Sequence, residues 1–94
     1  HLGFVGITDQ HKVLIGMFTD GDLRRLMDRQ ADIYQLTIDQ VMTQNPFCIH
    51  ADTLAVDILN MMERHAINSI MVIDANKSPV GALNMLDLIR AKII

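Results

Sequence analysis

The chain has 94 residues, of which half are hydrophobic and one fifth are charged. This apolar content is too high for an intrinsically disordered chain, and the length suits one small domain. The formal charge is −3, whereas nucleic-acid-binding proteins usually carry an excess of basic residues. No apolar run approaches the roughly 18 residues that a membrane-spanning helix needs. We therefore expect neither a nucleic-acid nor a membrane partner. The single cysteine excludes an internal disulfide and suits a reducing compartment.

The first part of the chain predicts two strands and a helix. Residues 4–8 and 13–18 are apolar runs bounded by turn-forming residues, which is typical of short strands. Residues 20–29 follow the second run, begin with acidic residues and predict a helix. Residues 30–36 link this unit to the next.

The link ends in a short predicted helix. Thr37 is followed three residues later by Gln40, which is the spacing of a capping box, so a helix should run from Thr37 to about Met42. Asn45 and Pro46 break it, because the residue before proline disfavours helical backbone.

The last part predicts a strand, a helix, two more strands and a final helix. Residues 47–50 form a short apolar run. Asp52 is a suitable N-cap for an amphipathic helix that ends near His65. Residues 69–74 and 79–83 predict strands that are close enough in sequence to pair as a hairpin. A final helix should begin near Met85 and bury Leu88, Ile89 and Ile93.

The sequence also repeats itself at an offset of 65 positions, without a gap from residue 1 to residue 29. The shift places residues 5–7 on 70–72 and residues 15–18 on 80–83. Six turn and helix residues then coincide, namely Asp9, Lys12, Gly16, Asp22, Leu23 and Arg25 with Asp74, Lys77, Gly81, Asp87, Leu88 and Arg90. Such a register indicates one supersecondary unit used twice.

The repeated unit has the order β-α-β-β-α, so the fold class is α/β (α+β). The first copy lacks its opening strand and helix, which would lie upstream of His1. A sheet without these elements leaves apolar faces uncovered. We expect the missing upstream segment or a partner chain to cover them, and we expect a homo-oligomer.

Three segments carry a resemblance to a known family. Residues 16–25, Gly-Met-Phe-Thr-Asp-Gly-Asp-Leu-Arg-Arg, and residues 81–88 are similar to the end of a CBS motif, and residues 41–46 resemble its start. The resemblance implies a tandem CBS pair, or Bateman module, with pseudo-twofold symmetry and nucleotide-binding clefts between the copies. The domains would be the second half of a first motif (1–29), a linker with the start of a short helix (30–40) and a second motif (41–94).

A narrower resemblance involves residues 16–25, Gln35-Leu36 and residues 41–43, which are similar to the C-terminal CBS pair of bacterial D-arabinose 5-phosphate isomerases. In that family a separate sugar-isomerase (SIS) domain is catalytic, and its product feeds the synthesis of Kdo, a lipopolysaccharide sugar. The resemblance implies a regulatory fragment of a cytoplasmic enzyme of a Gram-negative bacterium. Its implied partners are the SIS domain of the same parent chain and an effector such as AMP, ATP or CMP-Kdo.

The candidate ligand residues lie where a strand passes into a helix. Thr19 offers a hydroxyl donor and Asp22 offers acceptors for a ribose or sugar diol, next to a helix N-terminus that suits phosphate. The resemblance assigns both residues such roles. Thr and Asp are also favoured helix caps, so a structural role remains the alternative.

The second copy places Asn84 and Asp87 at the corresponding positions. Asn84 replaces the threonine, so the two corners need not bind alike, and one occupied site per chain is a reasonable expectation. These four residues are the candidate site.

No residues predict catalysis or metal binding. The four histidines are scattered, without zinc-site spacing, and no Ser-His-Asp or Cys-His arrangement is apparent. We therefore expect no metal, no catalytic residues and no cofactor beyond the possible effector. The alternative to a ligand-sensing module is an assembly element that binds no small molecule.

Overall fold

The elements follow the predicted order. The computed structural model describes residues 3–86. Within them the chain forms β1 (Phe4–Thr8), β2 (Leu14–Thr19), α1 (Asp20–Asp28), α2 (Ile38–Val41), β3 (Thr43–Gln44), β4 (Cys48–His50), α3 (Ala55–His65), β5 (Ser69–Ile73) and β6 (Pro79–Asn84).

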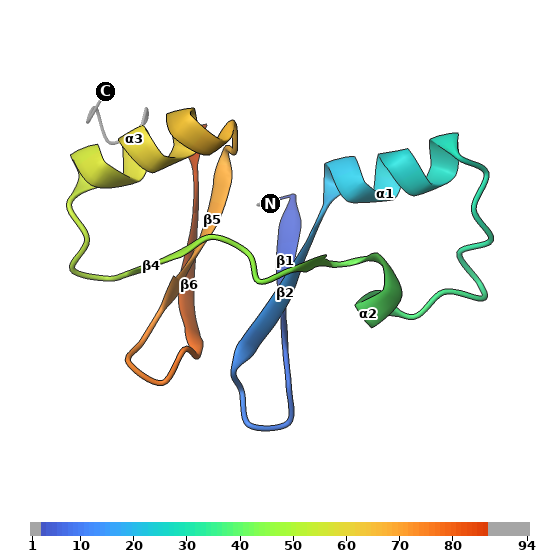
Figure 1. Cartoon of the computed structure of the whole chain (residues 1–94), viewed down its shortest axis with the longest axis horizontal. Coiled ribbons are helices and arrows are strands. Elements are labelled where there is room, and N and C mark those ends of the chain that lie inside the picture. Colours follow the sequence, from blue (N-terminus) through green and yellow to red (C-terminus); the bar gives the residue numbers. More distant parts are fainter. Residues whose placement is uncertain (1–2, 87–94) are drawn as a thin grey trace.

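The strands form two three-stranded sheets (Figure 1). In the first, of order β1-β2-β3, all neighbours are antiparallel. In the second, of order β4-β5-β6, β4 runs parallel to β5 and β5 antiparallel to β6. The extended segment that carries β3 and β4 passes from one sheet to the other (Figure 1). The expected hairpins and the mixed α+β class are therefore confirmed.

The strand pairing reproduces the repeat residue by residue. Phe4 pairs with Thr19 at one end of the first hairpin, and Ser69 pairs with Asn84 in the second. Each hairpin has its register shift at the corresponding step, between residues 7 and 8 and between residues 72 and 73. Residues 65 positions apart in the sequence therefore occupy equivalent positions in the two hairpins.

The hairpin turns repeat as well. Asp9 Oδ1 accepts hydrogen bonds from the backbone N–H groups of His11 and Val13, and Asp74 Oδ1 accepts them from residues 76 and 78. The bond from Val13 holds the pKa of Asp9 below its usual value, because it favours the ionised carboxylate. Lys12 and Lys77 both adopt positive φ, of 65° and 62°. The turn bonds therefore explain why the aspartate recurs in the sequence.

The core consists of two clusters that share β5. Ile70 packs with residues of α3 and β4, in the cluster Ile49, Ile58, Met62 and Ile70. Met71 and Ile73 pack with Leu14 of β2 in the second cluster. Because successive residues of a strand point to opposite faces, β5 binds α3 on one face and the first sheet on the other.

The first sheet has no counterpart of α3 among residues 3–86. Val5 of β1 remains 58% exposed, and Met27 of α1 is 62% exposed. The uncovered apolar side chains agree with an incomplete first unit, while the element that covers them stays a prediction. No helix within the same residues combines the length and the apolar content needed to cross a membrane.

Three details differ from the sequence-based expectations. Asp52 is not an N-cap, because Thr53 N–H donates to the carbonyl of His50 in a turn and α3 begins only after Leu54. The two-residue strand β3 was not predicted, since its pairing with β2 depends on a partner distant in sequence. The expected final helix lies largely outside the described residues.

Gly16 and Gly81 occupy equivalent positions but differ in their surroundings. A Cβ on Gly16 would lie 2.3 Å from Met42 Sδ and 2.8 Å from Met42 Cγ, whereas on Gly81 its nearest contact is Val72 Cβ at 3.7 Å. We expect Gly16→Ala to lower the free energy of unfolding by about 1–3 kcal/mol through overpacking, and Gly81→Ala to be neutral or slightly stabilising. Urea denaturation of both variants checks this. Equal effects would contradict the packing role of Gly16.

Ala66 ends α3 in the left-handed conformation, with φ of 53° and ψ of 43°. Glycine adopts this conformation without the steric cost of a Cβ. We expect Ala66→Gly to raise the free energy of unfolding by about 0.5–1 kcal/mol, and Ala55→Gly, in the first turn of the same helix, to lower it by a similar amount. Urea denaturation measures both, and a destabilised Ala66→Gly variant would contradict the expectation.

Candidate functional site

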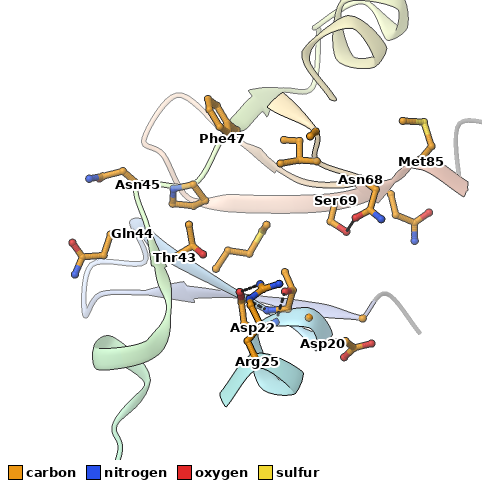
Figure 2. Close-up of a pocket in the computed structure, with 18 of the residues that line it drawn as sticks. Asp20, Asp22, Arg25, Thr43, Gln44, Asn45, Phe47, Asn68, Ser69 and Met85 are labelled. Atoms are coloured by element: carbon orange, nitrogen blue, oxygen red, sulfur yellow. Dashed lines mark hydrogen bonds and ion pairs between the residues drawn. The ribbon is translucent and has the colours of Figure 1, made fainter. Parts of the chain in front are cut away.

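A cleft of about 960 Å³ lies between the two halves of the structure (Figure 2). It is bounded by the two strand-to-helix corners, by the segment that joins the sheets and by the loop after α3. The described residues that line it are Gly3, Met17, Thr19, Asp20, Gly21, Asp22, Arg25, Thr43, Gln44, Asn45, Pro46, Phe47, Ala66, Ile67, Asn68, Ser69, Asn84, Met85 and Leu86. The two corners therefore face a common space.

The first corner is held by a reciprocal capping box. Thr19 is the N-cap of α1, and its Oγ1 accepts a hydrogen bond from the backbone N–H of Asp22 at 3.1 Å. Asp22 Oδ2 in turn accepts from the backbone N–H of Thr19 at 2.8 Å. Asp20 N–H donates to the carbonyl of Gly3 at 2.8 Å, which ties the corner to the start of β1. Thr19 and Asp22 thus have the structural role that was the alternative to ligand binding.

Arg25 completes this corner. Its Nη2 forms an ion pair with Asp22 Oδ1 at 2.5 Å (Figure 2). A Cβ on Gly21 would lie 3.4 Å from Arg25 Nη1, so the guanidinium group reaches back over the first turn of α1. The Asp22 side chain is only 16% exposed, whereas that of Arg25 is 69% exposed. The cleft therefore presents the cation more openly than the carboxylate with which it pairs.

The second corner has the same backbone with different side chains. Met85 N–H donates to the carbonyl of Asn68 at 2.8 Å, which matches the bond between Asp20 and Gly3 at the repeat offset. Asn84 ends β6 and lines the cleft, as Thr19 does in the first copy. Asp87, the fourth predicted site residue, lies outside the described residues. Where the first corner is acidic, the described part of the second is amide and apolar.

Between the two corners, the cleft is bordered by the segment that joins the sheets and by the loop after α3. Asn45 adopts a positive φ of 49°, and its N–H donates to the carbonyl of Ile15. Phe47 stacks on His65 at the end of α3, with ring centroids 4.0 Å apart and an interplanar angle of 24°. An aromatic ring and several side-chain amides thus border the same space as the charged corner.

Three of the four predicted site residues, Thr19, Asp22 and Asn84, therefore line one cleft. Arg25, Asn45, Phe47 and Asn68 also line it, although they were not among the residues predicted for the site. The repeat carries a signal for Asn68, because the offset of 65 makes it the counterpart of Gly3. Asn45 and Phe47 depend on contacts between distant segments, whereas Arg25 carried a local signal, because it lies three residues after Asp22 and recurs in the repeat. Ligand roles for all these residues stay a prediction.

Chemically, the described lining residues offer hydroxyl and amide groups, two carboxylates and one guanidinium group. This set suits a polar ligand that carries hydroxyls and an aromatic base, since each of these groups can pair with such a partner. Residues 3–86 contain no cluster of three or more His, Cys, Asp or Glu side chains arranged to hold a metal ion.

Comparisons with known proteins identify this arrangement. The CBS domain family matches residues 38–93. Over 93 residues the chain is 50% identical to the arabinose 5-phosphate isomerase KdsD of Pseudomonas aeruginosa, an alignment that covers 99% of this chain and 28% of that enzyme. The resemblance to this isomerase is therefore confirmed, and the chain matches only the part of it that forms a CBS pair.

Two solved structures share the fold. The CBS domain pair of protein MJ0100, in complex with 5′-methylthioadenosine and S-adenosyl-L-methionine, superposes with a TM-score of 0.86 at 24% identity, over 96% of this chain and 69% of that one. CBSX2 in complex with AMP gives a TM-score of 0.81 at 22% identity, over 97% and 71%. Both solved structures share the fold of this chain. Because the family match spans more than half of the sequence, the chain belongs to the CBS domain family.

Proposed function

We propose that this chain is the ligand-sensing CBS pair of a sugar-phosphate isomerase and that its cleft binds a nucleotide or a nucleotide-sugar. The observation that carries the proposal is the shared cleft, on which a charged corner, an amide corner and an aromatic ring converge. Relatives in fold that contain 5′-methylthioadenosine, S-adenosyl-L-methionine or AMP support a ligand built on a nucleoside.

The proposed isomerase is an arabinose 5-phosphate isomerase, the activity named for the similar enzyme of Pseudomonas aeruginosa. Since this chain spans 28% of that enzyme, catalysis would belong to a separate sugar-isomerase domain. The effector that the resemblance suggests is CMP-Kdo, an activated sugar formed later from the isomerase product, with AMP and ATP as generic alternatives. Such an effector regulates the enzyme only if it binds two arrangements of the CBS pair unequally.

Thr19 and Asp22 would contact the sugar hydroxyls from the first corner, and Asn84 and Asp87 would approach from the second. The capping box does not prevent this role. A carboxylate oxygen accepts more than one hydrogen bond, so Asp22 keeps acceptor positions beyond those used by Thr19 and Arg25.

The second candidate function is an assembly module that binds no small molecule. Exposed Val5 and Met27 favour it, because such side chains are suited to burial against another chain. Sedimentation at several protein concentrations distinguishes the two. The assembly hypothesis requires association that persists without nucleotide, and a monomer at all concentrations would exclude it.

For ligand sensing, we expect at least one of CMP-Kdo, AMP, ATP and CTP to bind the chain and to raise its melting temperature, because a ligand that binds only the folded state stabilises it. Isothermal titration calorimetry and thermal unfolding measure both effects. If none of the four produced heat or a shift, the ligand-sensing proposal would have to be abandoned.

Gly21 provides a probe of where the ligand sits. A Cβ there would meet Arg25 and Thr19 only at ordinary contact distances of 3.4 Å or more, so Gly21→Ala should raise the free energy of unfolding by about 0.5–1 kcal/mol through helix propensity. The same methyl group would project at the cleft and should weaken ligand binding. Gly81→Ala is the matched control, because Gly81 is not among the residues that line the cleft.

Gly21→Ala should therefore raise the free energy of unfolding and weaken nucleotide binding. Gly81→Ala should leave the affinity for the nucleotide unchanged. Calorimetry and urea denaturation on the same preparations give both values. Unchanged affinity in Gly21→Ala would place the ligand away from the first corner.

A further inference from the structure

We propose that Arg25 selects a ligand with a single phosphate, a nucleoside monophosphate or its ester, over the corresponding triphosphate. The inference rests on the proposed function and specifies the ligand class of the same cleft.

The described lining residues carry little positive charge. Asp20, Asp22 and Arg25 are the charged members, which gives this part of the lining a formal charge of −1. A triphosphate would bring several negative charges toward two carboxylates and one guanidinium group. Like charges brought together oppose binding, and one cation cannot compensate them all.

The N-terminus of α1 supplies little of the missing compensation, because three of its N–H groups already have acceptors within the chain. A free helix N-terminus binds phosphate through its unpaired N–H groups. Here Thr19 N–H donates to Asp22 and Asp22 N–H donates to Thr19, while Asp20 N–H donates to Gly3. The helix therefore carries its own carboxylate where a phosphate would bind in other proteins.

Among the described lining residues, Arg25 is the cation that can bind an acid. Its ion pair with Asp22 uses Nη2, and a guanidinium group has five N–H donors in a planar fork that fits two oxygens of one phosphate. The side chain is 69% exposed and folds back over Gly21 toward the cleft. Arg25 can thus hold one phosphate while it still pairs with Asp22, next to the proposed sugar position.

The experiment measures, by calorimetry at one fixed ionic strength, how tightly two ligand series bind the full 94-residue chain. The first series is adenosine, AMP and ATP, and the second is cytidine, CMP and CTP. In the series that binds, the monophosphate should bind about tenfold more tightly than the nucleoside, the scale of one charge-assisted contact. The triphosphate should bind no more tightly than the monophosphate. Higher salt should reduce the preference, because the contact is exposed.

Arg25→Gln should bring the ratio of monophosphate to nucleoside affinity down to about one, whatever its effect on nucleoside binding through Asp22, and Arg25→Lys should retain part of the preference. Arg24→Gln is the matched control, since Arg24 is exposed and does not line the cleft. Circular dichroism verifies that the variants are folded.

Two results would overturn the inference while leaving nucleotide sensing intact. One is a triphosphate that binds tenfold more tightly than the monophosphate, and the other is an Arg25→Gln variant that keeps the full preference. Failure of both series to bind would remove the proposed function and this inference together.

Discussion

The packing of β5 against both halves is the constraint on which the rest of the structure depends. Ile70 joins the cluster beneath α3, and Met71 and Ile73 on the other face pack against Leu14 of β2. A strand buried on both faces fixes the position of the second hairpin relative to the first. Because each hairpin leads into a corner with the same backbone hydrogen bonds, this packing also determines where the two corners meet.

Repetition of the backbone leaves the side chains free to differ. The bond from residue 20 to residue 3 has its counterpart from residue 85 to residue 68, so both corners have the same shape. Among the described residues, the side chains at these corners are Thr19, Asp20 and Asp22 on one wall and Asn84 and Met85 on the other. A symmetric framework therefore encloses an asymmetric cleft, which suits a ligand with a charged, hydroxyl-rich end and a flatter, less polar end.

Local features of the fold could be predicted from the sequence because they depend on neighbouring residues. The turns at Asp9 and Asp74 and the short helix after Thr37 are of this kind. The start of α3 was misplaced because Asp52 is a good cap in composition, yet the chain first makes a turn after His50. Likewise, Thr19 and Asp22 were found by motif, whereas Phe47 was missed, since its membership of the cleft depends on how distant segments pack.

The capping box gives the proposed ligand site a physical link to the rest of the chain. Asp22 joins the Thr19 backbone to the Arg25 side chain and contributes to both the cap and the cleft. A ligand that draws on the same carboxylate or guanidinium group must share or rearrange these bonds, and so acts on the first turn of α1. This helix anchors itself in the core through Leu26 and leads into the linker between the copies. Because Leu26 is the one buried residue of α1, little packing opposes such a rearrangement of the helix.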